Sequence, residues 1–107
     1  NVSVPTATVR IKTQDQVLEE AATGDGPVDA VFRAIDRATG IQTLLEEYNV
    51  KAVTPQKQAM GEVAVILSID DIRCIGRGSS TDVVEASARA YVNALNRYMV
   101  LKEGKGT

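Results

Sequence analysis

Hydrophobic and polar residues alternate at the start of the chain, which is the pattern of strands with one buried face. Ala7, Val9 and Ile11 alternate with polar residues and predict a first strand. A polar turn at residues 14–16 leads to a second predicted strand at residues 17–23. The chain is therefore expected to begin with a pair of strands.

The spacing changes in the next stretch, where apolar residues recur at intervals of three and four, as on one face of a helix. These residues are Val28, Val31, Phe32 and Ile35. Pro27 suits the first helical position because its missing N–H is not needed there, and Gly40 supplies a C-terminal stop. The sequence predicts one amphipathic helix between Pro27 and Gly40.

Alternation returns after this helix. Residues 48–54 indicate a third strand. The stretch before it, residues 43–47, is ambiguous between a short helical turn and the start of the strand. Residues 55–60 have the composition of a polar loop.

A fourth strand is predicted at residues 61–69, and its second face is partly apolar too, which is typical of a central strand. Asp70 and Asp71 suit a turn, from which residues 72–75 are expected to return antiparallel.

The last long stretch predicts a second helix. Asp82 and Glu85, three residues apart, resemble a capping box at its start. One face of the helix is marked by Val84, Ala88, Tyr91, Leu95 and Tyr98. Residues 102–107 lack an apolar anchor and are expected to form a flexible tail.

Together these elements predict an α+β fold of two pseudo-symmetric strand-strand-(strand)-helix units, with a largely antiparallel sheet and two helices. Residues 1–5 would be a lead-in to a folded domain at residues 6–101. Helices on one sheet face leave apolar strand surface that needs cover from the other unit or from a second chain. We favour the second chain, as a homodimer.

A glycine-containing stretch occurs twice, as Gly24-Asp25-Gly26 and as Gly76-Arg77-Gly78. Each is predicted to be a flexible turn at a helix N-terminus, where unpaired backbone N–H groups favour an anion such as a carboxylate. The alternative is a plain connection from strand to helix. Neither copy continues as a dinucleotide-binding or P-loop motif, which argues against nucleotide binding.

Composition narrows the function further. The 107 residues are 44% hydrophobic, with a net charge of −2 and interspersed signs, which disfavours nucleic acid and membrane partners. There is no histidine, and the single cysteine, Cys74, lies in an apolar run that suits a buried thiol. We therefore expect no catalytic residues and no metal site, and a cytoplasmic location. Asn1 in place of Met indicates a domain of a longer polypeptide or a processed chain.

Three motifs in this order resemble one known family. They are Gly24-Asp25-Gly26-Pro27-Val28-Asp29-Ala30, the stretch Leu44-Leu45-Glu46-Glu47-Tyr48-Asn49-Val50-Lys51-Ala52-Val53-Thr54, and the stretch from Gly76 to Ser87. The chain is similar to the C-terminal regulatory domain of 2-isopropylmalate synthase. The nearest alternative is the related domain of citramalate synthase, which answers to isoleucine.

The resemblance implies a homodimeric domain without a cofactor, attached to a catalytic TIM barrel that uses a divalent metal to condense acetyl-CoA with 2-oxoisovalerate. It also implies that leucine, the end product, binds between the two units near the dimer interface. By matching position, the effector-binding residues would be Gly24, Asp25, Gly26, Pro27, Val28, Leu45, Tyr48, Ala52, Ala59, Val83 and Val84.

These residues also suit the chemistry of an α-amino acid. Glycine-turn N–H groups can bind the carboxylate, Asp25 or Asp82 the ammonium, and an apolar group that includes Leu45 and Tyr48 the side chain. Each assignment has a structural alternative: Asp82 as a helix cap, which we favour, Tyr48 as a core residue and Asp25 as a turn residue. A dimerisation module without a ligand is the alternative for the whole domain.

Overall fold

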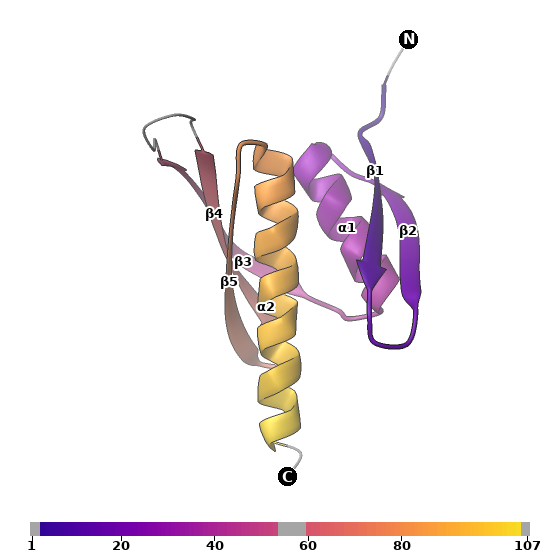
Figure 1. Cartoon of the computed structure of the whole chain (residues 1–107), viewed down its shortest axis with the longest axis vertical. Helices are drawn as coiled ribbons and strands as arrows, with labels where there is room; N and C mark the ends of the chain where they lie inside the picture. Colours follow the sequence, from indigo (N-terminus) through magenta and orange to yellow (C-terminus); the bar gives the residue numbers. More distant parts are fainter. Residues whose placement is uncertain (1–2, 54–59, 106–107) are drawn as a thin grey trace. The chain divides into compact units, whose positions relative to one another are not determined.

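The strands and helices fall into two compact units in the computed structural model, which describes residues 3–53 and 60–105 (Figure 1). Unit 1 ends at Gln42, and unit 2 begins at Thr43. Each unit consists of antiparallel strands followed by a helix. The α+β fold of two strand-and-helix units predicted from the sequence is confirmed.

Unit 1 contains β1 (Thr6–Lys12), β2 (Val17–Thr23) and α1 (Pro27–Thr39). The two strands pair antiparallel with Ala7 opposite Ala22 and Ile11 opposite Leu18, so that their apolar side chains share one face. α1 packs on both strands. The alternating pattern at the start of the chain thus forms the expected pair.

Both ends of α1 follow the sequence prediction. Pro27 occupies the first turn, and Gly40 ends the helix in the left-handed region with φ 70°, donating its N–H to the Asp36 carbonyl at 2.8 Å. The buried residues of α1 are Ala30, Val31, Phe32, Ala34 and Ile35.

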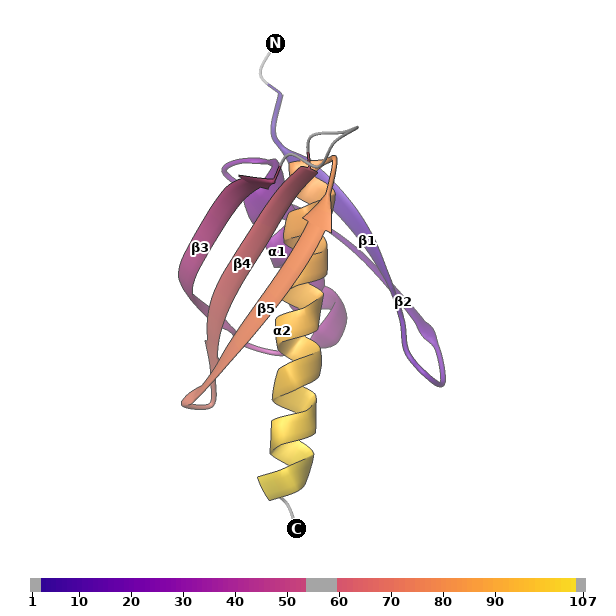
Figure 2. The ribbon, with the colours of Figure 1, turned by 60° about the vertical axis from the view of Figure 1, so that its left-hand side comes forward.

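Unit 2 contains β3 (Leu44–Val53), β4 (Met60–Ile69), β5 (Ile72–Ser80) and α2 (Val83–Lys105). The sheet has the order β3-β4-β5, so β4 is central as predicted, and α2 packs on β5 and β4 (Figure 2). The ambiguous stretch before residue 48 is the start of β3, with a bulge between Leu45 and Glu47. Asp70 and Asp71, with φ 50° and 64°, form the tight turn between β4 and β5.

The prediction of a second glycine turn is wrong. Gly76 and Gly78 lie inside β5, which continues to Ser80, instead of at the start of a helix. They are buried on the face of the strand that α2 covers. A Cβ atom at Gly78 would lie 2.5 Å from the Ala86 carbonyl oxygen and 2.6 Å from the Ala90 nitrogen. These glycines therefore allow the helix to pack closely on the strand. Their spacing of two residues places both on one face of a strand, whereas a turn would not.

The two units therefore correspond to each other in a different alignment from the one that the repeated Gly-x-Gly sequences suggested. Helix starts correspond, so that Gly26, the residue before α1, is equivalent to Asp82, the residue before α2. The two Gly-x-Gly sequences thus occupy positions that are not equivalent.

The second helix is also longer than its apolar stripe suggested. α2 continues through Lys105, so residues 102–105, which were assigned to the tail, are helical.

We predict that Gly78→Ala lowers the free energy of unfolding by about 3 kcal/mol or more, because the added methyl group meets helix backbone that cannot turn aside. Gly104→Ala is the matched control. A Cβ there meets nothing within 4 Å, and alanine favours a helix, so stability should stay equal or rise by up to about 1 kcal/mol. Urea denaturation followed by circular dichroism measures both, and equal midpoints for the two variants would contradict the close packing.

Candidate functional site

The first glycine turn connects β2 to α1 in unit 1, as predicted. Its geometry depends on space at Gly24, where a Cβ would lie 2.5 Å from the Ala30 nitrogen. Gly26 has extended backbone with φ −154°, a conformation that any residue adopts. The turn is held by Asp29, whose Oδ2 accepts the Asp25 N–H at 2.8 Å and the Arg33 Nε at 2.9 Å.

The start of α1 has backbone donors that the helix itself does not use. The N–H of Ala30 donates to the Gly26 carbonyl at 2.9 Å, and it is the first donor of the helix to do so. The N–H groups of Val28 and Asp29 precede it and have no carbonyl acceptor within the helix. Gly26 has no side chain with which to cap them. They carry partial positive charge and suit a carboxylate.

Asp25 lies beside these donors in the turn. It is exposed, and its carboxylate makes no hydrogen bond or ion pair with any residue that the structure describes. The turn and the helix start thus supply an acceptor for an ammonium and donors for a carboxylate, which are the two polar groups of an amino acid.

In unit 2, β3 presents an apolar face that α2 leaves partly uncovered. Leu45 pairs with Leu67 of β4, Tyr48 with Val65, Val50 with Val63 and Ala52 with Gly61, so the four lie on the face of the sheet toward α2. We call this set the β3 face: Leu45, Tyr48, Val50 and Ala52. Leu45 remains 41% exposed and Val50 50% exposed, although the partners of both on β4 are fully buried. This strip can therefore contact an apolar ligand or another chain.

Tyr48 is fastened to α2 through its hydroxyl group. The hydroxyl forms a 2.7 Å hydrogen bond with Ser87 Oγ, and Ser87 also donates to the Val83 carbonyl at 2.7 Å. A second bond, between Thr43 Oγ1 and the Tyr91 hydroxyl, connects the segment before β3 to the same helix. Tyr48 is half-buried, so it both packs in unit 2 and borders the open strip.

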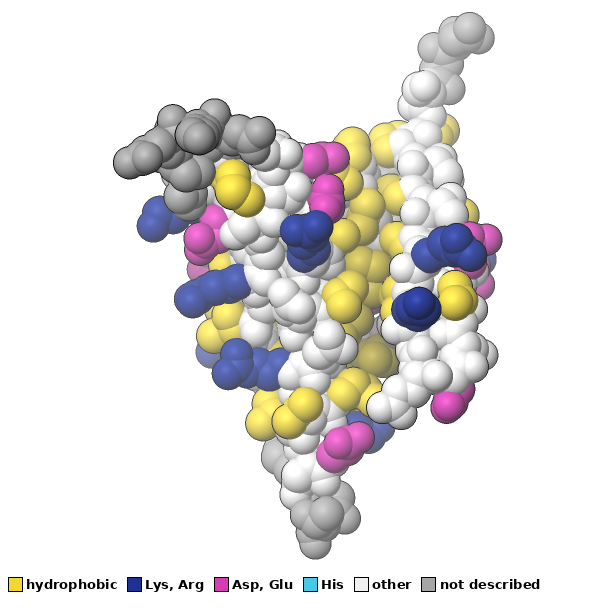
Figure 3. All heavy atoms as spheres, viewed as in Figure 1, with side chains coloured by type: hydrophobic (Ala, Val, Ile, Leu, Met, Phe, Trp, Pro, Cys, Tyr) yellow, Lys and Arg dark blue, Asp and Glu magenta, His cyan; other side chains and the backbone are white. Residues whose placement is uncertain are grey.

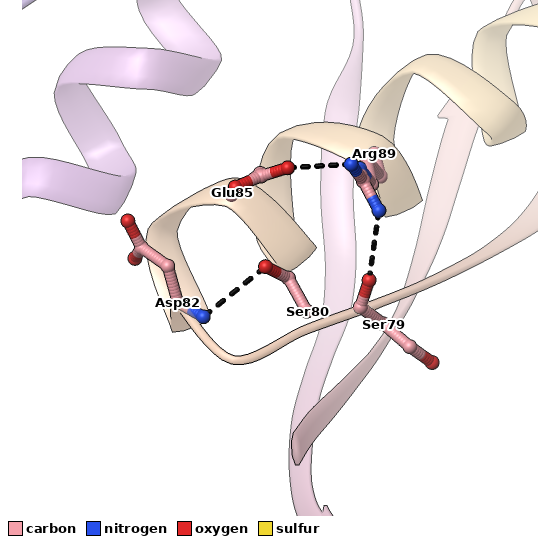
Figure 4. A network of polar contacts seen from close by, with 5 residues as sticks. All are labelled: Ser79, Ser80, Asp82, Glu85 and Arg89. Atoms are coloured by element: carbon pink, nitrogen blue, oxygen red, sulfur yellow. Dashed lines mark hydrogen bonds and ion pairs between the residues drawn. The ribbon is translucent and has the colours of Figure 1, made fainter. Parts of the chain in front are cut away.

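The start of α2 adjoins this strip. Val83 is 39% exposed, and its Cγ2 lies 3.1 Å from the position of a Cβ on Gly61, the residue paired with Ala52. Asp82 caps the helix, because its Oδ1 accepts the Val84 N–H at 2.8 Å. Its own N–H bonds to Ser80 Oγ, whereas the Glu85 carboxylate pairs with Arg89, so the reciprocal half of the predicted capping box does not form (Figure 4).

The predicted effector-binding residues thus form two groups. Gly24, Asp25, Gly26, Pro27 and Val28 are neighbours in unit 1. Leu45, Tyr48, Ala52, Val83 and Val84 belong to unit 2. Ala59 lies outside the described residues. Val50 and Ser87 were not in the predicted set, and alternation with Tyr48 and Ala52 is the signal that could have included Val50.

Two side chains, the thiol of Cys74 and the phenol of Tyr98, have a raised pKa. Burial raises the pKa of the Cys74 thiol, and the charge of Arg97 only partly offsets this. The hydrogen bond that Tyr98 donates to Asp70 at 2.6 Å raises the pKa of its phenol. Within the described ranges there is no cluster of three or more residues that could hold a metal ion, and neither helix is long and apolar enough to span a membrane.

Comparison with known proteins identifies one family. The model of the LeuA allosteric (dimerisation) domain matches residues 1–99. A 2-isopropylmalate synthase of Brevibacillus brevis is 54% identical over 100 residues, which are 92% of this chain and 20% of that protein. The enzymes of the same name from Ruminiclostridium cellulolyticum and Aquifex aeolicus are 50% and 44% identical over 97 and 100 residues, covering 91% and 94% of this chain and 19% of each enzyme. The chain spans about a fifth of the length of these relatives.

We predict that the bond between Tyr48 and Ser87 is measurable as a coupling energy. Tyr48→Phe and Ser87→Ala should each lower the free energy of unfolding by about 1 kcal/mol, because each removes the hydrogen bond between the two side chains, and Ser87→Ala also removes the bond to the Val83 carbonyl. The double variant should cost less than the sum of the two, with a coupling of about 0.5–1 kcal/mol in urea denaturation. Fully additive effects would show that the hydroxyl group does not hold β3 to α2.

Proposed function

This chain belongs to the LeuA allosteric (dimerisation) domain family, and we propose that it binds leucine as a feedback inhibitor within a 2-isopropylmalate synthase. The observation that carries the proposal is the family match over residues 1–99, joined to relatives of that name at 44–54% identity. We place acyl transfer from acetyl-CoA, and the divalent metal it would need, in the remaining four fifths of the parent enzyme, in the cytoplasm.

The polar end of leucine is assigned to unit 1. The amino-acid carboxylate would accept the N–H groups of Val28 and Asp29 at the start of α1, and the ammonium would donate to Asp25. Support comes from the two donors left over by the helix and from the carboxylate of Asp25 in the preceding turn, which has no partner among the described residues.

The isobutyl group is assigned to the β3 face and Val83 in unit 2. These side chains are apolar and partly exposed, and Gly61 adds no side chain beside them. Burial of the isobutyl group against these side chains would favour binding by roughly 25 cal/mol for each Å² of apolar surface removed from water. Ala59 remains a sequence prediction of the same group.

Two alternative functions predict different responses of the chain to amino acids. An isoleucine-binding domain of a citramalate synthase would prefer isoleucine over leucine. A dimerisation module without an effector would respond to neither. A thermal-shift series with leucine, isoleucine and valine separates the three, because a ligand at 100 times its dissociation constant stabilises the native state by about 2.7 kcal/mol.

We predict that the chain is a homodimer. Apolar side chains remain exposed in unit 2, including Leu44 at 66%, Val100 at 68% and Leu101 at 42%, and a second copy would cover them. Sedimentation equilibrium at micromolar concentration should give twice the mass of one chain. A single-chain mass under these conditions would exclude a stable dimer.

We also predict that Asp25→Asn weakens leucine binding by about ten- to a hundredfold in calorimetry, because it removes a charged partner of the ammonium. Asp15→Asn, an exposed turn aspartate of the same unit, is the matched control and should change the affinity less than twofold.

In the parent enzyme, Asp25→Asn should relieve inhibition by leucine while turnover without leucine stays unchanged, since an effector acts through its differential affinity for two states. If Asp25→Asn, folded and dimeric, binds leucine as tightly as the Asp15→Asn control, the ammonium has been assigned to the wrong residue.

A further inference from the structure

A groove runs along the free edge of β5 in unit 2, between that strand and α2. It consists of two hollows of about 650 and 550 Å³ that share Arg77 and Asn93 in their walls. Four arginines line it: Arg73 and Arg77 from β5, and Arg89 and Arg97 from α2. Lys and Arg side chains gather over this side of unit 2 in Figure 3. Because β3 forms the opposite edge of the sheet, the groove is separate from the β3 face.

Backbone groups of β5 also face the groove. Asn93 Nδ2 donates to the Arg77 carbonyl at 2.7 Å, and Arg89 donates to the Ser79 carbonyl at 3.1 Å (Figure 4). Both carbonyls therefore point away from β4. In an antiparallel pair the N–H and C=O of one residue point to the same side, so the N–H groups of Arg77 and Ser79 face the free edge as well. Because this direction repeats every second residue, the N–H group of Ile75 faces the same edge.

The positive charge in the groove is only partly neutralised. Arg89 pairs with Glu85 at 2.5 Å, and Arg73 lies 3.5 Å from Glu46. Arg77 and Arg97 make no ion pair with the residues that the structure describes. Among the described residues, Glu62 is the one acidic residue in the wall of either hollow. The chain as a whole has a net charge of −2, so this concentration of arginine is local.

We propose that this groove binds a polyvalent oxyanion of metabolite size, one that carries phosphate groups or several carboxylates. Guanidinium groups bind both kinds of anion in bidentate fashion, and those of Arg77 and Arg97 have no anionic partner in the described part of the chain. A single carboxylate would neutralise only one. An added β-strand is the less suitable occupant, because side chains of α2 already bond to the carbonyls of Arg77 and Ser79.

The test is a titration of the 107-residue chain with inorganic pyrophosphate at constant ionic strength and without leucine, followed by NMR of backbone amides and arginine side chains. Saturable shifts are expected at Ile75, Arg77 and Arg97. The double variant Arg77→Gln/Arg97→Gln should weaken binding at least tenfold. Arg10→Gln/Arg37→Gln removes the same charge from unit 1 and should change the affinity less than twofold.

The possible results of this titration lead to different conclusions. Shifts that do not saturate, or equal weakening by both double variants, would overturn the site and indicate nonspecific attraction by net charge. A parallel titration with citrate identifies the source of the charge. Saturation by pyrophosphate alone supports a phosphate-bearing ligand, and saturation by citrate alone supports a polycarboxylate. Because leucine is absent throughout, the result does not depend on the proposed function.

Discussion

Unit 2 depends on the close approach of α2 to β5. Gly76 and Gly78 have no side chains on the strand face under the helix, and the helix presents Ala86, Ala90 and Ala94 to it, all fully buried. Backbone therefore packs almost directly on backbone, which leaves no space for a methyl group. Because interiors are close-packed and yield little, this contact decides where the helix lies over the sheet.

That position explains the open surfaces of the unit. A helix drawn onto β5 and β4 covers the inner side chains of β4 fully but leaves β3 half covered, and polar bonds from Tyr48 and Thr43 hold that strand to it. The half-covered strand is where we assign the apolar part of the effector. On the other side of the contact, Arg89 and Asn93 reach the strand edge and form the wall of the arginine groove.

The first backbone N–H groups of the helix are treated differently in the two units. In unit 2, Asp82 uses its own carboxylate to satisfy the first turn of α2. In unit 1, the equivalent residue is Gly26, which has no side chain, so the first N–H groups of α1 remain available. The start of α2 is therefore capped by a side chain, whereas the start of α1 is not. Only the uncapped start suits an anionic group. This difference supports the choice of unit 1 for the polar end of leucine.

Local pattern was sufficient for most of the elements. Period two predicted the strands, period three to four predicted both helices, and Pro27 and Gly40 marked the ends of α1, because these signals act within a few residues. The same was true of Asp82 as a cap. Pattern failed at Gly76 and Gly78, since a turn glycine and a strand glycine look alike until the packing partner is known. Only tertiary structure revealed that partner, the alanine face of α2, and with it the extension of β5, the partly uncovered β3 face and the arginines gathered at one edge. Those features depend on contacts between residues far apart in the chain, which no local spacing records.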